Sequence, residues 1–274
     1  VTNPVDGSID FDKVREDALK HRPKMILAGY TSYPRDLDYE AFVSIAEEVG
    51  AITMTDASHF GGLVAGGAMK NPFDFGFDVV TTTTHKSLRG PRGGMILCKK
   101  EFAKKIDKSV FPGLQGGPHM NAVAAIATTL LKAQGQEFKN YAQQVLVNAK
   151  TLAASLMERQ ASLVTGGTDN HMMVVDTSIS YGLDGRVAEE LLDKASITTN
   201  KQIIPDDPNP PLRPSGIRIG TPAATARGMG EADMEKLAAW IHTCLTNPED
   251  EAKITSIKGE VEDFCQQFPV PGLE

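Results

Sequence analysis

The sequence predicts an α/β domain with a mostly parallel sheet, followed by a smaller α+β domain. In the first half, helical and strand-like patterns alternate, which is typical of a parallel sheet covered by helices. From about Pro118 long helical patterns take over, and the remainder mixes helices with short strands. We place the boundary within residues 134–136, so that residues 1–135 form the first domain and residues 136–274 the second.

Hydrophobic periodicity predicts the elements of the first half. Apolar residues at helical spacing indicate a helix over residues 11–21, which Pro23 ends. The same spacing indicates a helix over residues 39–49, and Gly50 stands where a left-handed helix cap belongs. Short apolar runs, and a run rich in Val and Thr, which favour strands, predict the strands of this half. These strands cover residues 25–28, 51–56, 78–84 and 94–98.

The second half is expected to begin with two long helices, over residues 121–133 and 138–159. A helix as long as the second often links two domains. The elements expected beyond it are strands near residue 163 and over 173–176 and 217–220, a helix over 185–194, a proline-rich loop over 205–214, and terminal helices.

Composition excludes several classes of function. The 28 Lys and Arg against 35 Asp and Glu give a net charge of −7, without a basic block, which disfavours binding to nucleic acid. Three cysteines lie far apart, so we expect neither disulfides nor a metal site. A reducing compartment fits best, so we expect the cytoplasm, with an organelle as the alternative. No apolar run has the length that spans a bilayer, so we expect no membrane span.

The sharpest local signal is the segment of residues 79–94, in which a strand is followed by His85, Lys86 and a glycine-rich turn. Ligands of α/β folds bind beyond the carboxyl ends of the strands, where Lys86 is expected. Four consecutive threonines also place hydroxyl groups on both faces of the strand, and a polar ligand can supply partners for them. The alternative is a surface lysine in a polar loop, which Lys86 taken alone would favour.

The second signal is Asp56, at the end of the strand over residues 51–56. Its side chain is expected in the same crevice as Lys86, where a buried carboxylate needs a cationic or hydrogen-bonding partner. The pyridinium nitrogen of a cofactor anchored as a Schiff base on Lys86 would be such a partner. The alternatives are a helix N-cap for Asp56 and a structural role for His59, which follows it.

Two further segments carry weaker signals. The glycines of residues 111–118 precede a helix, which is the geometry that holds a phosphate or, alternatively, an ordinary tight turn. Arg218 lies in the middle of a short apolar strand, where an unpaired guanidinium would be costly. We expect a carboxylate partner, which either a substrate or the protein itself can provide.

Four motifs in order along the chain resemble those of the serine hydroxymethyltransferase family, whose members are pyridoxal-phosphate enzymes with the aminotransferase-like fold (fold type I). The motifs occupy residues 81–94, 111–118, 166–171 and 215–223. The resemblance extends over the whole chain and implies that the family's N-terminal part is absent, in agreement with the start at Val1. That part carries the family's acid/base glutamate, its tyrosines and its first phosphate loop.

The resemblance implies a role for each candidate residue. Lys86 would form the Schiff base with pyridoxal phosphate, Asp56 would pair with the pyridine nitrogen, and His59 would stack on the ring. The implied catalytic residues are Lys86, Asp56, His59, Thr83 and His85, and those implied to bind the cofactor are Lys86, Asp56, His59, Thr31, His85, Arg92, Gly116 and Gly117. The two glycines would reach the cofactor phosphate of a neighbouring subunit, and Arg218 would bind the substrate carboxylate.

The activity so implied is the reversible transfer of the serine hydroxymethyl carbon to tetrahydrofolate, which gives glycine and 5,10-methylenetetrahydrofolate, by a homodimer or homotetramer. Gln202 stands where the family usually has Asn, which puts a folate contact there in doubt, while residues 203–214 would border the folate site. The alternatives are another enzyme of this fold, such as a threonine-aldolase-like enzyme, and a non-catalytic cofactor-binding fragment.

Overall fold

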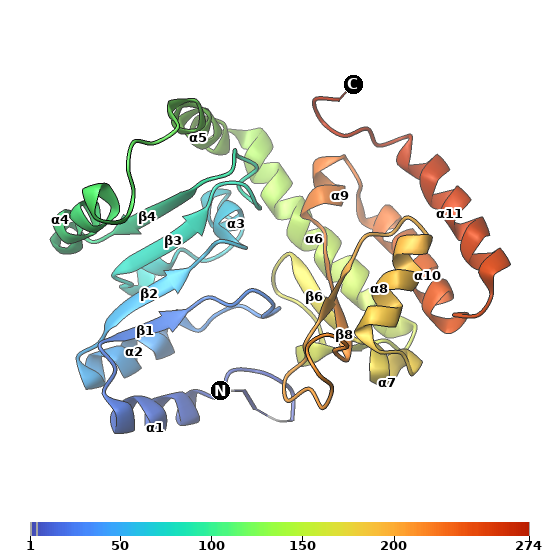
Figure 1. Cartoon of the computed structure of the whole chain (residues 1–274), viewed down its shortest axis with the longest axis horizontal. Coiled ribbons are helices and arrows are strands. Elements are labelled where there is room, and N and C mark those ends of the chain that lie inside the picture. Colours follow the sequence, from blue (N-terminus) through green and yellow to red (C-terminus); the bar gives the residue numbers. More distant parts are fainter. Residues whose placement is uncertain (1, 4, 274) are drawn as a thin grey trace. The chain divides into compact units, whose positions relative to one another are not determined.

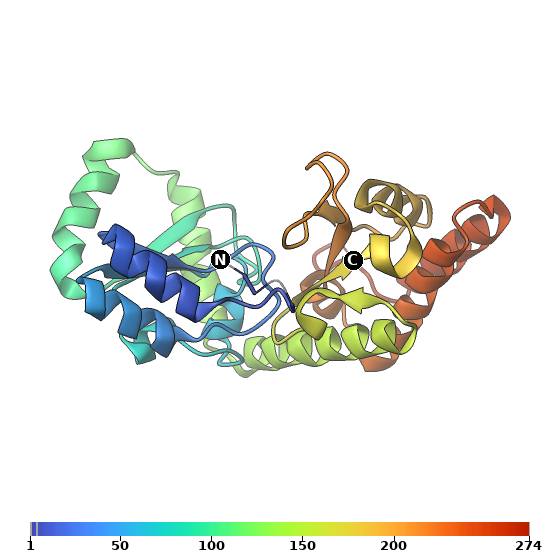
Figure 2. The same cartoon turned by 90° about the horizontal axis from the view of Figure 1, so that it is seen from below.

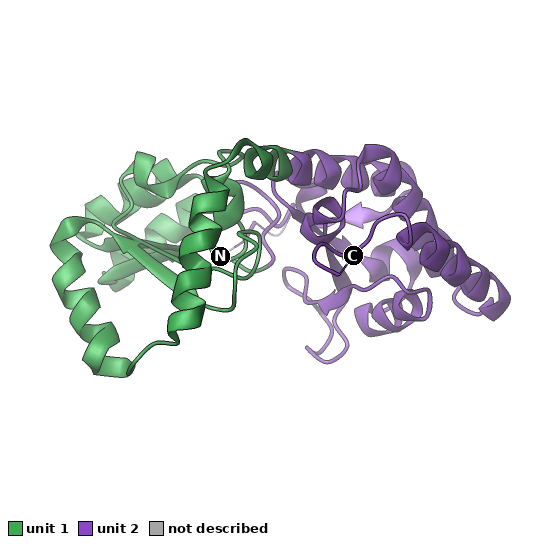
Figure 3. Cartoon of the chain, turned by 90° about the horizontal axis from the view of Figure 1, so that it is seen from above, with its two compact units in different colours: residues 1, 10–31, 37–143 green, residues 2–9, 32–36, 144–274 purple. Residues whose placement is uncertain are grey.

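The computed structural model describes residues 2–3 and 5–273, which form two compact units (Figure 3). The first unit contains residues 10–31 and 37–143, and the second contains residues 32–36 and 144–273 with the described part of 2–9. The sequence predicts a division after residue 135, which is where the helix α6 (Gln136–Glu158) begins. The division between the units falls inside α6 instead, because its residues 136–143 cluster with the first unit.

A four-stranded sheet in the order β1-β2-β3-β4 forms the centre of the first unit (Figure 1). The first three strands are parallel, and β4 runs antiparallel to β3. The strands are β1 (Met25–Ala28), β2 (Ile52–Asp56), β3 (Val79–Thr83) and β4 (Gly94–Cys98). The predicted α/β class with a mostly parallel sheet is therefore confirmed.

The helices α1 (Phe11–His21) and α2 (Tyr39–Val49) run side by side (Figure 2), and α2 contacts β1 and β2. Each helix begins after an aspartate whose side chain accepts a backbone N–H of the first turn, Asp10 for α1 and Asp38 for α2. Gly50 ends α2 with φ of 72°, which is the predicted left-handed cap. Both helices have the bounds that the sequence predicts.

Several short elements of the first unit are not predicted by the sequence. They are α3 (Gly61–Ala65), the 3₁₀ helix η1 (Pro72–Phe75), α4 (Lys100–Lys108) and the π-helical segment η2 (Ser109–Leu114), while α5 (Met120–Ala133) begins one residue before its predicted start. Two glycines give α3 a poor helix propensity. Gly62 is nevertheless required there, because a Cβ at this position would overlap the backbone carbonyl of Ser87. The close approach of the Ser87 backbone therefore explains why a glycine stands in this helix despite its poor helix propensity.

The second unit contains an antiparallel sheet in the order β5-β6-β8-β7. Its strands are β5 (Ser162–Leu163), β6 (Met172–Asp176), β7 (Asn200–Gln202) and β8 (Gly216–Gly220). Its helices besides α6 are the 3₁₀ helix η3 (Val164–Gly166), α7 (Thr177–Tyr181), α8 (Gly185–Lys194), α9 (Pro222–Ala226), α10 (Glu231–Thr246) and α11 (Glu251–Cys265). The sequence does not predict β7, since three polar residues show no alternation.

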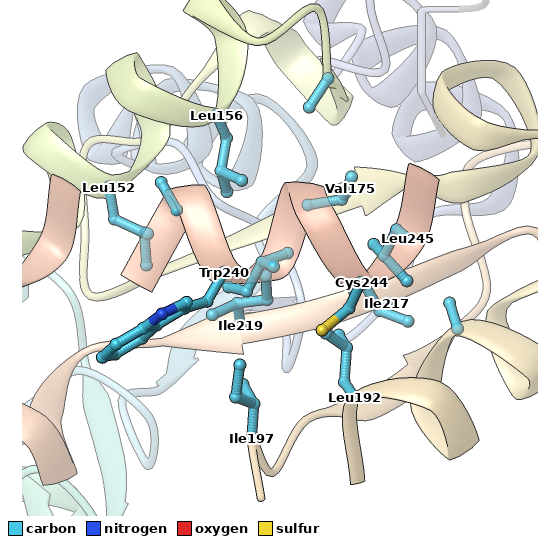
Figure 4. Packing of buried hydrophobic residues seen from close by; sticks show 14 of the residues in the cluster. Leu152, Leu156, Val175, Leu192, Ile197, Ile217, Ile219, Trp240, Cys244 and Leu245 are labelled. Atoms are coloured by element: carbon cyan, nitrogen blue, oxygen red, sulfur yellow. The ribbon is translucent and has the colours of Figure 1, made fainter. Parts of the chain in front are cut away.

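One hydrophobic core organises the second unit. Side chains of α10, including Trp240 and Cys244, lie over Ile217 and Ile219 of β8 (Figure 4). Helices α6, α8 and α11 contribute further buried residues to the same cluster, among them Leu152. This face of the sheet is closed to solvent, so β8 is held firmly between its neighbours.

Among the described residues, no helix combines the length and the apolar character that crossing a bilayer requires.

Candidate functional site

The carboxyl ends of β1, β2 and β3 bring together most of the residues that the sequence singles out. Because the three strands are parallel, with Ala28 beside Thr55 and Asp56 beside Thr81, their ends share one edge of the sheet. The candidate residues at or just beyond these ends are Thr31 after β1, Asp56 and His59 after β2, and Thr83, His85 and Lys86 after β3. This edge is where open α/β sheets bind ligands.

Gly29 allows the end of β1 to lie directly against Asp56. Its φ is 95°, in the left-handed region that favours glycine. A Cβ at this position would overlap the carbonyl oxygen of Asp56. Gly29 therefore allows the segment of Thr31 to lie close to Asp56, although no pattern in the sequence assigns this glycine a role.

Asp56 is half-buried, and its carboxylate oxygen Oδ1 accepts the Ser58 backbone N–H at 2.9 Å. It does not cap the next helix, because the N-cap of α3 is Phe60. Asp56 lines a cavity of about 890 Å³, whose wall also includes Thr81 of β3 and Ile96 of β4. The helix-cap alternative for Asp56 is therefore wrong, and its carboxylate borders a space of the size that ligand sites have.

The threonines after Thr81 find hydrogen-bond partners within the chain. Thr82 donates to the backbone of the loop after β2. Thr83 Oγ1 donates to the Ser58 carbonyl at 3.2 Å, and Thr84 Oγ1 donates to the Pro91 carbonyl at 2.6 Å. These hydroxyls tie the end of β3 to the two loops that flank it.

Lys86 lies in a turn held by backbone bonds. Its carbonyl accepts the Arg89 N–H at 2.9 Å, and the Gly93 N–H donates to His85 Nδ1 at 3.4 Å. The side chains of Lys86 and Arg92 are both exposed, while His85 is half-buried. The amine of Lys86 is therefore accessible at the strand edge while its backbone is fixed.

Ser87 links the Lys86 turn to the segment of His59, and sequence reasoning missed it. The Ser87 side chain is 3% exposed. Its hydroxyl donates to the His59 carbonyl at 2.8 Å and accepts the Gly62 N–H at 3.0 Å. Its position could have indicated this role. Ser87 directly follows Lys86 in the longest motif, close to the end of a buried strand, where a hydroxyl has little access to water and needs a partner within the protein.

The glycines of the loop before α5 lie apart from these residues. Gly116 and Gly117 are exposed, and a Cβ on either would meet no atom within 4 Å. Gln115 before them lines the same cavity as Asp56. The structure therefore joins this loop to the Asp56 cavity through Gln115, and the glycines themselves face open space.

Arg218 belongs to the second unit, in the middle of β8. Its Nε–H donates to the Oδ1 of Asn200 at 3.2 Å. Burial lowers the pKa of Arg218, because a desolvated guanidinium loses hydration of its charge. Asn200 is uncharged, so this bond orients the guanidinium and does not neutralise it.

Asp56 lies at the carboxyl edge of a parallel sheet and lines a cavity, and the exposed Lys86 follows the next strand, which is the arrangement with which open α/β sheets bind ligands. Comparison with known proteins is more specific, since the model of the serine hydroxymethyltransferase family matches residues 1–241. A serine hydroxymethyltransferase of Sorangium cellulosum (strain So ce56) is 52% identical over 268 residues, which are 98% of this chain and 63% of that protein. One of Desulfotalea psychrophila (strain LSv54 / DSM 12343) is 50% identical over 269 residues, with the same coverage.

The chain therefore belongs to the serine hydroxymethyltransferase family, as its motifs predict. The aminotransferase-like fold (fold type I) that the resemblance implies is the fold of this family, and the α/β unit with its mostly parallel sheet agrees with it. The chain spans 63% of the length of the curated relatives it matches.

Proposed function

We propose that this chain takes part in the reversible reaction of serine with tetrahydrofolate, which gives glycine, 5,10-methylenetetrahydrofolate and water, with pyridoxal phosphate as cofactor. The observation that carries the proposal is the common edge of β1, β2 and β3, at which Asp56 and Lys86 both lie. Family membership supports the same reaction, since both relatives described above are named serine hydroxymethyltransferase.

The residues at this edge fit pyridoxal phosphate. When bound, the cofactor supplies a ring that accepts the electrons released at the substrate α-carbon. The Asp56 carboxylate would hold a proton on the ring nitrogen, which keeps the ring electron-poor, and the exposed amine of Lys86 would anchor the cofactor covalently. His59 would stack on the ring. Further residues proposed to surround the cofactor are Thr31, Thr83, His85 and Arg92.

Arg218 is proposed to bind the substrate carboxylate. Its guanidinium carries a charge at a half-buried position, where bidentate bonds to a carboxylate are strong. Fixing the carboxylate orients the substrate, and orientation selects the bond that breaks. In this assignment residues 1–135 bind the cofactor, residues 136–274 carry the carboxylate site, and the loop of residues 203–214 borders the folate.

Hydrogen bonds within the proline-rich loop of residues 203–214 and to Ser215 hold its backbone in place. The Asp207 carboxylate accepts the backbone N–H groups of Ile204, Asn209 and Ser215, and also the Ser215 hydroxyl. Burial raises the pKa of Asp207, but these hydrogen bonds outweigh it and the net shift is downward. A carboxylate that stays ionised retains these hydrogen bonds, which link Ile204, Asn209 and Ser215 within the loop.

We propose a homodimer or homotetramer in which Gly116 and Gly117 reach the cofactor phosphate of a neighbouring subunit. Backbone N–H groups of such glycines bind phosphate well, and both residues are exposed. The net charge of −7 argues against nucleic acid as a partner. We propose the cytoplasm as the location, because three unpaired cysteines suit a reducing compartment.

The test begins with the chain incubated with pyridoxal phosphate, reduced with borohydride and mapped by peptide mass spectrometry. We expect the adduct on Lys86 and its loss in Lys86→Arg, with Lys132→Arg as the control because Lys132 is also exposed. Serine turnover with and without tetrahydrofolate then follows. Serine turnover at the same rate with and without tetrahydrofolate would favour a threonine-aldolase-like enzyme. An adduct on Lys86 without any turnover would favour a non-catalytic fragment. An adduct spread over many lysines would overturn the proposed cofactor site.

A further inference from the structure

We propose that Thr81 is a second binding partner of the cofactor's ring nitrogen, beside Asp56, and that its hydroxyl joins the ring to the Asp56 carboxylate. The inference rests on the proposed function, in which pyridoxal phosphate binds at Asp56. It concerns the first residue of the longest motif, to which the resemblance assigns no role.

The register of the first sheet places Thr81 directly beside Asp56. The two residues are partners in the parallel ladder of β2 and β3, and Thr81 is also the partner of Ile96 on β4. Side chains of residues paired in this way lie on the same face of a sheet. In agreement with this register, all three residues line the cavity of about 890 Å³. A ligand that binds the Asp56 carboxylate in this cavity therefore has Thr81 as a neighbour.

The hydroxyl of Thr81 differs from those of the three threonines that follow it. Thr82, Thr83 and Thr84 each donate to a backbone carbonyl. Within the described part of the chain, the Thr81 hydroxyl has no hydrogen-bond partner, and the residue is half-buried in the cavity wall. Its backbone is fixed, since its carbonyl accepts the Ala57 N–H at 2.8 Å. The hydroxyl is therefore held where a ligand can supply its partner.

The Asp56 carboxylate has one oxygen bound by the protein and one left open. Oδ1 accepts the Ser58 N–H at 2.9 Å, whereas Oδ2 accepts no hydrogen bond from the described residues. The charged residues that line the cavity, among those the structure describes, are Asp56 and Asp107, and both are acidic. Such a wall favours a ligand that donates a hydrogen bond from a positively charged group. The protonated ring nitrogen of pyridoxal phosphate is a group of this kind.

A hydroxyl beside this pair can strengthen it, because a hydroxyl is both a donor and an acceptor. The oxygen of Thr81 can accept from the ring N–H, and its hydrogen can donate to the open oxygen of Asp56. Hydrogen bonds linked in this way reinforce one another. Because the hydroxyl is neutral, it holds the ring against the carboxylate without adding a charge that competes with Asp56.

The test compares two ligands that differ at the ring nitrogen. In deazapyridoxal phosphate a C–H group replaces this nitrogen, while the aldehyde and the phosphate are unchanged. The Kd of each ligand is measured by absorption titration for wild type, Thr81→Val, Thr81→Ser and Thr55→Val. Valine removes the hydroxyl and keeps the branched shape of threonine, and serine keeps the hydroxyl.

Thr55→Val is the matched control. Thr55 precedes Asp56 on β2, and its hydroxyl also lacks a hydrogen-bond partner among the described residues. Unlike Thr81, it is 0% exposed. Because side chains alternate along a strand, Thr55 lies on the face opposite Asp56 and the cavity. This variant therefore removes an unpaired hydroxyl from the same sheet without changing the cavity wall.

We expect Thr81→Val to raise the Kd of pyridoxal phosphate about three- to tenfold, which corresponds to the loss of one hydrogen bond. The Kd of deazapyridoxal phosphate should change about twofold at most, because this ligand has no ring nitrogen for Thr81 to bind. Thr81→Ser and Thr55→Val should bind both ligands within about twofold of wild type. Without ligand, Thr81→Val should unfold at the same denaturant concentration as wild type, since the hydroxyl it loses has no partner in the described chain.

An unchanged Kd of pyridoxal phosphate in Thr81→Val would overturn the inference, as would an equal loss for both ligands, which indicates a structural defect. Asp56→Ala separates these failures from failure of the proposed function. If Asp56→Ala binds pyridoxal phosphate as tightly as wild type, the proposed cofactor site is wrong and the Thr81 inference falls with it. If Asp56→Ala weakens binding and Thr81→Val does not, the proposed function stands and the inference alone is wrong.

Discussion

The two units differ in how completely their own residues enclose their apolar side chains. In the second unit, helices and strands share one core, in which Leu152, Met173 and Ile217 are fully buried. In the first unit, no described residue from Arg89 to Lys132 is buried, although this stretch contains β4, α4, the π-helical segment η2 and most of α5. The large apolar residues exposed in this stretch are Ile96, Leu97, Phe111, Leu114, Met120, Val123, Leu130 and Leu131.

The second unit is therefore stabilised within itself, whereas the large apolar side chains of residues 89–132 in the first unit are left uncovered by the described part of the chain. Exposed apolar patches are typical of protein–protein interfaces. The exposed loop of Gly116 and Gly117 lies inside this stretch, which agrees with the proposed homodimer. Truncation of an apolar side chain is therefore expected to cost more stability in the core of the second unit than within residues 89–132.

The largest expected effect is in the core of the second unit. Leu152→Ala removes a side chain that is 0% exposed and should lower the free energy of unfolding by about 2–5 kcal/mol. The matched control is Leu131→Ala on α5, which is 70% exposed and should cost less than about 0.5 kcal/mol. Chemical denaturation of both variants measures the contrast.

The cost of Leu131→Ala also tests whether a second copy of the chain covers α5. If a second copy covers α5, the cost of Leu131→Ala should grow with protein concentration, because association stabilises the folded state by mass action. Equal costs for Leu131→Ala and Leu152→Ala at low concentration would mean that residues 89–132 contribute to a core of the isolated chain, and the contrast between the units would be wrong.

A smaller effect is expected at the edge of the first sheet. Gly29→Ala forces a Cβ into the Asp56 carbonyl at φ of 95°, and should cost about 2–3 kcal/mol. Gly116→Ala is the control, since its Cβ would meet nothing within 4 Å, and should cost less than about 0.5 kcal/mol. Thermal or chemical unfolding compares the two. A Gly29→Ala protein as stable as wild type would show that β1 and β2 separate easily at this edge.

The sequence predicts those helices and strands whose apolar residues recur with the clear period of a helix or form a clear strand-like run. The helix of residues 11–21 and the strand of residues 94–98 both have their predicted bounds. It fails where tertiary packing overrides propensity, as at α3, whose Gly62 serves the close approach of the Ser87 backbone. It also fails for β7, because three polar residues become a strand only when β8 lies beside them.

For the candidate site, the sequence predicts that Asp56 and Lys86 share one edge, because strand ends can be located from apolar runs. The network that holds them could not be predicted. Ser87 bonds to His59 across 28 positions, and Asn200 bonds to Arg218 across 18. Such contacts depend on how separate strands are aligned, which no local pattern records.

The smallest expected effect is a pH dependence of the second unit. His242 packs against Tyr181 with ring centroids 5.8 Å apart. Burial, and then the nearby charge of Arg159, lowers the pKa of His242, while burial raises the pKa of Tyr181 to about 12. Both side chains are therefore neutral in the folded protein near pH 7.

Because the folded pKa of His242 lies below its unfolded value of about 6.5, the unfolded state binds more protons in this window. The free energy of unfolding should therefore fall as pH drops below about 6.5 and approaches the folded pKa. His242→Phe keeps a ring beside Tyr181 without a titrating group, and should remove this part of the slope, whereas His242→Gln should remove the slope and lose the ring contact. Denaturation curves from pH 7.5 to 5 compare the three proteins, and the same slope in all of them would contradict the assignment to His242.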